Sequence, residues 1–131
     1  MKLIYPAIFT PLEESDGFCV TFPDLPGCVT QGASLAEAVE MAADAASGWI
    51  LDELEDGNDI PKASKPDRTG LEENAFVSLV VLDMDAYSAK YGTNDVQKSC
   101  RIPAWLNTRA ETAHIDFSAV LKEALISRLG I

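Results

Sequence analysis

The chain begins with an apolar, β-favouring run, and the later run "FCVTF" alternates apolar and polar residues with a period of two. Three β-favouring runs, "KLIYPAIFTPLEE", "FCVTF" and "CVTQG", are separated by the turn-forming stretches "ESDG" and "PDLPG". Alternation is typical of half-buried strands, and Asp-Gly and Pro-Gly pairs are typical of the turns between them. The pattern predicts a small antiparallel meander of three strands.

From Ser34 onward, the spacing of apolar residues is that of a helix. The stretch "SLAE" is a capping box, in which Ser34 and Glu37 satisfy backbone donors at the start of a helix. Apolar residues then recur at helical spacing, which predicts an amphipathic helix over about 34–55, packed on one face of the sheet. The predicted apolar stripe comprises Leu35, Val39, Ala42, Ala46, Trp49 or Ile50, and Leu54.

A polar loop follows this helix, with Gly57 as its stop signal and Pro61 just beyond it. The run "AFVSLVVLD" is apolar and β-branched enough for a buried strand, and "DAYSAKYG" predicts one or two helical turns. Residues 1–93 are therefore predicted to form one domain with the element order β-β-β-α-β.

The last part of the chain predicts a second, smaller domain over residues 96–131. "VQKSCRIP" is predicted to be a strand stopped by Pro103, "AWLNTRAETA" a short helix, and "FSAVLKEALISRL" a longer amphipathic helix. One strand and two short helices cannot bury a core alone. This domain is therefore expected to pair with a second copy of itself.

Charge differs between the two predicted domains. The formal net charge of the chain is −11. Residues 1–95 carry five Lys and Arg against 18 Asp and Glu, a balance of −13, whereas residues 96–131 carry five against three, a balance of +2. The acidic part favours a basic protein over nucleic acid as its partner, and the other part tolerates a polyanion.

The sequence offers little for catalysis. His114 is the single histidine, and it lies in the turn between two predicted helices, where His tolerates a left-handed backbone. Asp24 and Cys28, in the stiff stretch "FPDLPGCVTQG", make neither a metal site nor an activated nucleophile. We therefore expect no enzymatic activity, no catalytic residue, no cofactor and no metal. A nuclease that uses Asp24 and Asp83 is the enzymatic alternative.

Cysteine usage and hydropathy predict a cytoplasmic protein that does not enter membranes. The three cysteines form no C-x-x-C pair, and an odd number of dispersed thiols suits a reducing compartment. "MKLIYPAIF" is a poor signal peptide because Pro6 interrupts it. The longest later apolar run, "AFVSLVVL", is far shorter than the roughly 20 residues that a membrane helix needs.

The predicted strand of the C-terminal domain carries side chains that can read DNA bases. Paired with its copy, this strand would form a two-stranded ribbon, which fits the major groove. Alternation would turn Gln97, Ser99 and Arg101 outward together. Phe117 and Ser118, which begin the longer helix, would present backbone amides to a phosphate. The alternative is an arm used only for dimerisation, whose outward residues merely confer solubility.

Two long stretches resemble a known family. Residues 5–61, which contain "FPDLPGC-TQG" and then an "S-L-x-E-A" helix start, resemble the N-terminal domain of HicB-family antitoxins. Residues 100–131 resemble the ribbon-helix-helix tail of many of these proteins. The resemblance implies an α+β chain with a partial RNase H-like β-β-β-α-β domain, followed by a ribbon-helix-helix (β-α-α) domain for dimerisation and DNA binding.

The family resemblance also implies a function. It implies an antitoxin that covers a small basic HicA-like, mRNA-cleaving toxin, and that represses its own operon by binding operator DNA. It assigns base reading to Gln97, Ser99 and Arg101, and a phosphate clamp to Phe117 and Ser118. It implies a homodimer through the C-terminal domain, and pairing of the N-terminal domains as well would give a tetramer.

Further expectations concern individual side chains. His114 stands where relatives often carry glycine, and Asp116 stands where Asn is common. An acidic cap facing a phosphate repels it by about 1 kcal/mol or less. The residues predicted to contact the toxin are the exposed acids of the long helix, Glu37, Glu40 and Asp44. The alternative to an antitoxin is a stand-alone ribbon-helix-helix regulator whose N-terminal domain senses a ligand or oligomerises.

Overall fold

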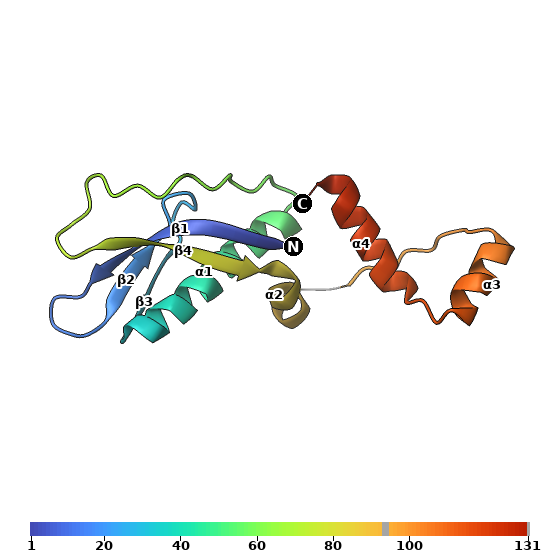
Figure 1. Ribbon diagram of the computed structural model, residues 1–131, viewed down its shortest axis with the longest axis horizontal. Helices are drawn as coiled ribbons and strands as arrows, with labels where there is room; N and C mark the ends of the chain where they lie inside the picture. The colour runs from blue at the N-terminus through green and yellow to red at the C-terminus, as the bar shows by residue number, and fades with distance from the viewer. Residues whose placement is uncertain (93–94, 131) are drawn as a thin grey trace. The chain divides into compact units, whose positions relative to one another are not determined.

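A four-stranded antiparallel sheet with a long helix on one face begins the chain, and two shorter helices end it. Figure 1 shows the computed structural model, which describes residues 1–92 and 95–130. The chain divides into two compact units, Lys2–Thr93 and Asn94–Ile131. We call these the N-terminal unit and the C-terminal unit, and describe each by itself.

The sheet contains all four strands of the N-terminal unit. They are β1 (Lys2–Pro11), β2 (Phe18–Thr21), β3 (Val29–Gly32) and β4 (Phe76–Asp83), in the spatial order β3-β2-β1-β4. All neighbouring pairs are antiparallel. The predicted meander of three strands is confirmed, and β4 lies beside β1 at the opposite edge from β3.

The connection between β1 and β2 is longer than a two-residue hairpin. The Leu12 amide donates to the Gly17 carbonyl at 2.9 Å, so the chain reverses over residues 12–17. The predicted Asp-Gly turn lies at the end of this loop. Because Phe18 pairs with Gly32 in the register of β2 and β3, the loop returns directly into the sheet.

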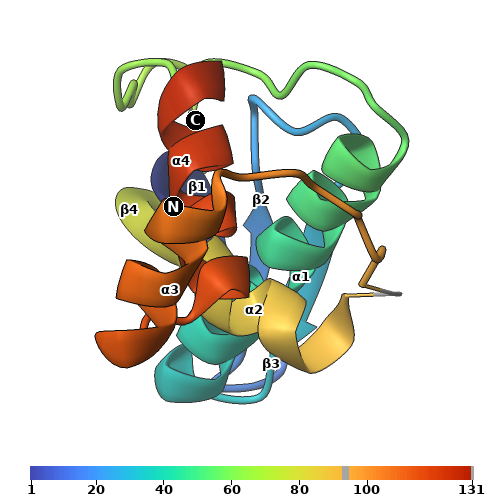
Figure 2. The same cartoon turned by 90° about the vertical axis from the view of Figure 1, so that its right-hand side faces the viewer.

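Helix α1 (Leu35–Glu55) covers one face of the sheet (Figure 2). The Ser34 hydroxyl accepts a hydrogen bond from the Glu37 amide at 3.2 Å, which confirms the predicted N-cap. The predicted apolar stripe is wrong at its N-terminal end, because Leu35 and Val39 are both 46% exposed. The buried residues of α1 are Ala38, Ala42, Ala46, Ser47 and Ile50.

Small side chains explain which face of α1 is buried. The alanines at spacing four let the helix backbone lie close to the sheet, and longer branched side chains would hold it away. Gly32 in β3 lies at the closest approach, where an added Cβ would overlap the backbone nitrogen and Cα of Ala38. The glycine of the "TQG" stretch is therefore required by packing.

The face of the sheet opposite α1 leaves apolar side chains in solvent. Ile4 pairs with Val81, and Pro6 pairs with Leu79, so these residues share that face. The side chains of Ile4, Leu79 and Val81 are 49%, 54% and 56% exposed. The prediction of a buried strand over 75–83 is thus correct for one face of β4 only, because β4 is an edge strand with a helix on one side.

The segment between α1 and β4 is extended and runs the length of the sheet (Figure 1). Hydrogen bonds attach it to the domain at two of its residues, Pro61 and Ser64. The Tyr5 hydroxyl donates to the Pro61 carbonyl. The Asp24 carboxylate accepts from both the amide and the hydroxyl of Ser64, at 2.9 and 3.0 Å. These contacts hold the segment against β1 at Tyr5 and against the β2–β3 turn at Asp24.

The C-terminal unit contains α3 (Ala104–Thr112) and α4 (Phe117–Leu129), which confirms both predicted helices. The strand predicted over 96–103 is not formed, and the described residues 95–103 have no regular secondary structure. A strand needs a neighbour for its backbone amides and carbonyls, and a single chain supplies none here. Among the described residues of this unit, none is buried.

Candidate functional site

The three acids predicted to contact a toxin lie on α1. Glu37, Glu40 and Asp44 are all exposed. Their spacings of three and four residues place them along one side of the helix. They present negative charge to solvent, and their contact with a partner stays a prediction.

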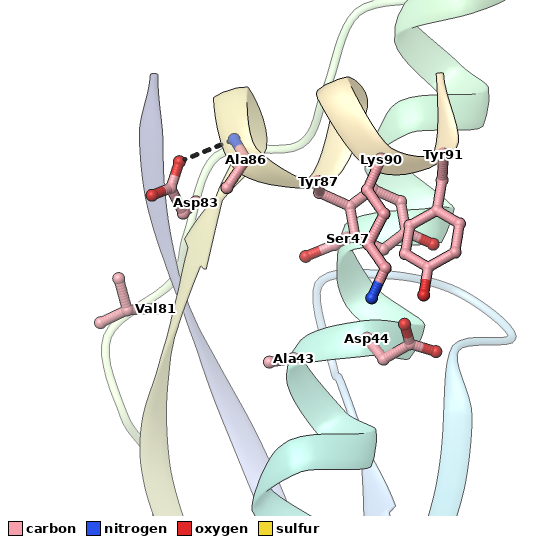
Figure 3. Close-up of a pocket in the computed structure, with 9 residues that line it drawn as sticks. All are labelled: Ala43, Asp44, Ser47, Val81, Asp83, Ala86, Tyr87, Lys90 and Tyr91. Atoms are coloured by element: carbon pink, nitrogen blue, oxygen red, sulfur yellow. Dashed lines mark hydrogen bonds between the residues drawn. The ribbon is translucent and has the colours of Figure 1, made fainter. Parts of the chain in front are cut away.

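A groove lies between α1 and α2 (Met84–Tyr91), and Figure 3 shows it in close-up. We call it the α1–α2 groove; its volume is about 400 Å³. α2 begins at Asp83, whose carboxylate accepts from the Ala86 amide at 3.1 Å. Of the three predicted acids, Asp44 alone lines this groove. Its other polar and aromatic lining residues are Ser47, Asp83, Tyr87, Lys90 and Tyr91.

Tyr87 joins the two walls of the groove. Its hydroxyl lies against α1 at Gly48, where an added Cβ would be 3.0 Å from the Tyr87 oxygen. Its ring centroid is 4.8 Å from that of Tyr91, with the ring planes inclined at 42°. Tyr87 is half-buried, whereas the Tyr91 side chain is 51% exposed. One ring therefore fixes α2 on α1, and the other stands open to solvent.

The charged residues that line the groove are two carboxylates, Asp44 and Asp83, and one ammonium, Lys90. Burial, and after it the nearby Asp44 carboxylate, raises the pKa of the Tyr87 hydroxyl, and Tyr91 and Asp52 add smaller contributions in the same direction. The Lys90 ammonium lies 5.1 Å from the centroid of the Tyr91 ring, within the range of a cation–π contact. The site thus combines carboxylates with an aromatic face that already holds a cation.

The stretch "FPDLPGC" is a packed turn between β2 and β3. The Cys28 amide donates to the Leu25 carbonyl at 3.0 Å, and the side chains of both residues are buried. The Trp49 indole of α1 donates to the Pro26 carbonyl at 3.0 Å. Burial raises the pKa of the Cys28 thiol. A buried thiol with a raised pKa is inert, which suits a structural role for this turn.

The two carboxylates of the nuclease alternative have structural partners. Asp24 accepts two hydrogen bonds from Ser64, and Asp83 caps α2. Within residues 1–92 and 95–130, no group of three or more His, Cys, Asp or Glu side chains could hold a metal ion. In the same ranges, no helix has both the length and the apolar character to cross a membrane.

The residues predicted to bind DNA lie in two parts of the C-terminal unit. Gln97, Ser99 and Arg101 are exposed in the irregular segment before α3. Phe117 and Ser118 form the first turn of α4 and are also exposed. Their grouping into one DNA-reading surface stays a prediction, since it requires the paired ribbon.

The turn between α3 and α4 follows the local signals in the sequence. His114 has a φ of 56°, which confirms that it occupies a left-handed turn position. The Asp116 carboxylate accepts from the Ala119 amide at 3.1 Å, which confirms Asp116 as the N-cap of α4. The left-handed backbone at His114 and the Asp116 cap therefore define this turn.

Sequence reasoning missed the tyrosines and the lysine of the α1–α2 groove. The stretch "DAYSAKYG" predicts the short helix, and the spacing of four between Tyr87 and Tyr91 places both rings on one side of it. That spacing was the available signal. It does not reveal that Tyr87 meets Gly48, a contact between segments far apart in the chain.

The fold and groove together define a class of protein: an acidic α+β domain with a solvent-open carboxylate and tyrosine site, joined to a helical unit that exposes its apolar residues. Residues 5–125 match the family described as "HicB_like antitoxin of bacterial toxin-antitoxin system". The chain belongs to this family.

Two curated relatives match part of the chain, and one of them is an antitoxin. The chain is 35% identical over 83 residues to "Antitoxin HicB 1" of Photorhabdus laumondii, a match covering 63% of this chain and 53% of that protein. It is 32% identical over 83 residues to an uncharacterised 14.9 kDa protein of Haemophilus phage HP1, covering 63% of this chain and 60% of that one. The matches thus span little more than half of the length of either relative.

Solved structures share the fold. A "Toxin-Antitoxin complex from Streptococcus pneumoniae" matches with a TM-score of 0.60 at 22% identity, over 98% of this chain and 99% of that one. The Burkholderia pseudomallei antitoxin HicB matches with a TM-score of 0.56 at 21% identity, over 97% of this chain and 98% of that one. A "HicA3 and HicB3 toxin-antitoxin complex" matches 62% of this chain and 99% of that one, with a TM-score of 0.52 at 28% identity.

Proposed function

We propose that this chain is an antitoxin that neutralises a small basic HicA-like, mRNA-cleaving toxin and represses its own operon. The observation that carries the toxin-binding half is the acidity of the N-terminal part: residues 1–95 have a balance of −13 and present Glu37, Glu40 and Asp44 on one helix. Complementary charge accelerates encounter with a basic partner and selects against wrong ones. Membership of the HicB-like antitoxin family supports the same function.

The N-terminal unit has the element order of the partial RNase H-like domain implied by the resemblance. Its strands and long helix follow as β-β-β-α-β, with α2 after β4. We propose that this domain is a binding module without nuclease activity. The hydrogen bonds that engage Asp24 and Asp83 support this proposal.

The C-terminal unit is proposed to dimerise as a ribbon-helix-helix and to bind operator DNA. Its exposed apolar side chains support dimerisation, since they gain a core only from a second copy. Residues 95–103 would then pair with their copy, and Gln97, Ser99 and Arg101 would face the major groove. The largest exposed apolar residues of the two helices and the turn are Trp105, Leu106, Ile115, Phe117, Val120, Leu121, Leu125 and Leu129.

A tetramer is proposed as the larger assembly. The open sheet face at Ile4, Leu79 and Val81 supports pairing of N-terminal units in addition to the C-terminal dimer. Light scattering during gel filtration measures the mass of the assembly. A monomer at micromolar concentration would contradict both contacts.

Co-expression tests the toxin-binding half. The neighbouring genes are searched for a basic product of under about 100 residues, which is expressed with and without this chain. Relief of growth arrest, and co-purification of the two proteins, are the expected results. Persistent arrest together with intact operator binding would instead identify the chain as the stand-alone regulator.

Operator binding tests the DNA-binding half. Arg101→Ala should weaken binding by about 1–3 kcal/mol if Arg101 contacts a base. Arg128→Ala, in the last turn of α4, removes the same charge outside the predicted reading surface and serves as the matched control. Titration of the promoter fragment by gel shift gives both affinities. Equal effects of the two variants would contradict base reading by Arg101.

A further inference from the structure

The α1–α2 groove has the composition of a guanidinium site. It contains the Asp44 carboxylate on one wall and the exposed Tyr91 ring on the other (Figure 3). We propose that this groove receives one arginine side chain of the toxin, paired with Asp44 and stacked on Tyr91. This inference rests on the proposed toxin-binding function and names the anchor point of that interaction.

The position of Lys90 supports a cation at this place. Its ammonium lies 5.1 Å from the centroid of the Tyr91 ring. The chain's own cation therefore already occupies the ring face that an incoming arginine would use. Because both Lys90 and Tyr91 are exposed, the lysine can turn into solvent when the arginine enters.

The carboxylates of the groove divide into a structural one and an available one. Asp83 caps α2 through the Ala86 amide. Asp44 lies on the solvent side of α1, where its charge faces the groove. A guanidinium can pair with the Asp44 carboxylate through two parallel N–H groups, and an anionic ligand would be repelled.

The geometry favours arginine over lysine. The planar guanidinium is more weakly hydrated than an ammonium, and it can stack on a ring while its edge binds a carboxylate. The Tyr87 and Tyr91 rings, 4.8 Å apart, offer the apolar surface for that stacking. Arginine and tyrosine are also enriched among the residues that dominate binding energy at interfaces.

The groove is formed before any partner binds. The Tyr87 hydroxyl packs at Gly48, and the Asp83 cap fixes the start of α2. A preformed site loses little conformational entropy on binding, so most of the free energy of its contacts contributes to affinity.

The experiment measures binding of the full chain to the neighbouring basic toxin, made inactive by an active-site substitution. Asp44→Asn should raise the Kd about ten-fold and Tyr91→Leu about five-fold, mainly through faster dissociation, because a lost contact acts on dissociation. Glu73→Gln makes the same charge change at an exposed position outside the groove. It should change the Kd less than about two-fold.

Lys90→Gln gives a result of opposite sign. Removing the internal competitor for the Tyr91 ring should lower the Kd about three-fold. Lys62→Gln removes the same charge elsewhere on the exposed surface and measures the general electrostatic effect. The proposal requires a gain for Lys90→Gln that exceeds the gain for Lys62→Gln.

The outcomes separate the two levels of inference. Failure of the unaltered chain to bind the toxin would overturn the proposed function, and the groove inference with it. Binding with dissociation rates unchanged by Asp44→Asn and Tyr91→Leu would overturn the groove inference alone. Circular dichroism shows whether each variant is folded, and Tyr91→Leu changes an exposed residue and so keeps the test open should Asp44→Asn perturb α1.

Discussion

Large apolar side chains close a core in the N-terminal unit, whereas in the C-terminal unit they remain in solvent. Every buried apolar residue of the described ranges lies between Tyr5 and Met84. In the C-terminal unit, Trp105 and Leu129 are 66% and 69% exposed. Apolar residues therefore stabilise one unit from within, and in the other their exposure supports the proposed pairing with a second copy.

This difference teaches how the two units should respond to mutation and dilution. Packing within one chain gives a stability that does not depend on protein concentration. Packing between copies gives a stability that rises with concentration, because association is linked to folding. Each unit carries one tryptophan, Trp49 or Trp105, so single Trp→Phe variants let fluorescence report one unit at a time.

The largest expected effect is in the core beneath α1. Ile50 is fully buried, so Ile50→Ala should lower the free energy of unfolding of the N-terminal unit by about 2–5 kcal/mol. The loss should be the same at low and high protein concentration. Urea unfolding followed by Trp49 fluorescence in a Trp105→Phe background measures it.

Leu125→Ala is the matched change in the C-terminal unit. Leu125 is 52% exposed in the single chain, so its truncation costs little there. In the proposed dimer, Leu125→Ala should lower the free energy of unfolding of the C-terminal unit. This loss should be seen only if the unfolding transition of that unit depends on protein concentration. If the unfolding transitions of both units were independent of protein concentration, this difference between the two units would be contradicted.

Local signals explain most of the fold that the sequence predicts. The strand runs, the Ser34 and Asp116 caps and the left-handed turn at His114 depend on neighbours a few residues away. Such features are encoded where they occur, by side chains that bond nearby backbone groups. They can therefore be predicted without knowledge of the tertiary structure.

Tertiary and intermolecular contacts explain what the sequence does not predict. The buried face of α1 includes Ala38, because the Gly32 backbone of β3 lies against it. The α1–α2 groove exists because Tyr87 meets Gly48 from a distant segment. The strand predicted before Pro103 has no neighbouring strand among the described residues of the C-terminal unit, and its formation stays a prediction that depends on the proposed pairing.

Two glycines of the N-terminal unit sharpen this difference between local and tertiary information. Gly32→Ala places a Cβ on the backbone of Ala38, which cannot yield without moving α1 off the sheet. Overpacking of this kind costs about 1–3 kcal/mol. Thermal unfolding of the N-terminal unit should show a corresponding fall in Tm.

Gly48→Ala is the control for that variant. Its added Cβ would lie 3.0 Å from the Tyr87 hydroxyl, the far end of a side chain, which has to shift by only a few tenths of an ångström. The gain in helix propensity, about 1 kcal/mol, offsets the contact. A larger loss for Gly48→Ala than for Gly32→Ala would contradict the assigned packing of α1.

The two N-caps compare the units at a smaller scale. Ser34→Ala should cost about 1 kcal/mol of N-terminal stability, because the Glu37 amide loses its acceptor. Asp116→Asn should leave α4 capped, since Asn is an equally good cap. It removes a negative charge from the predicted phosphate site, so operator affinity should rise by up to about five-fold. Unfolding curves and gel shifts measure the two effects, and weaker operator binding by Asp116→Asn would contradict phosphate contact at that turn.

The smallest effect concerns thiols and pH. Burial raises the pKa of Cys28, so the folded N-terminal unit favours the protonated thiol. The stability from this preference is complete below the unfolded value of about 8.5, and it is lost as pH rises through the higher folded value. The free energy of unfolding should therefore fall as pH rises above about 8.5, with a slope of at most about 1.4 kcal/mol per pH unit from this group. Cys28→Ala should flatten that slope, whereas Cys100→Ala, in the exposed segment before α3, should leave the slope of the N-terminal transition unchanged. Equal slopes in all three proteins would show that the Cys28 thiol titrates alike in the folded and unfolded chain.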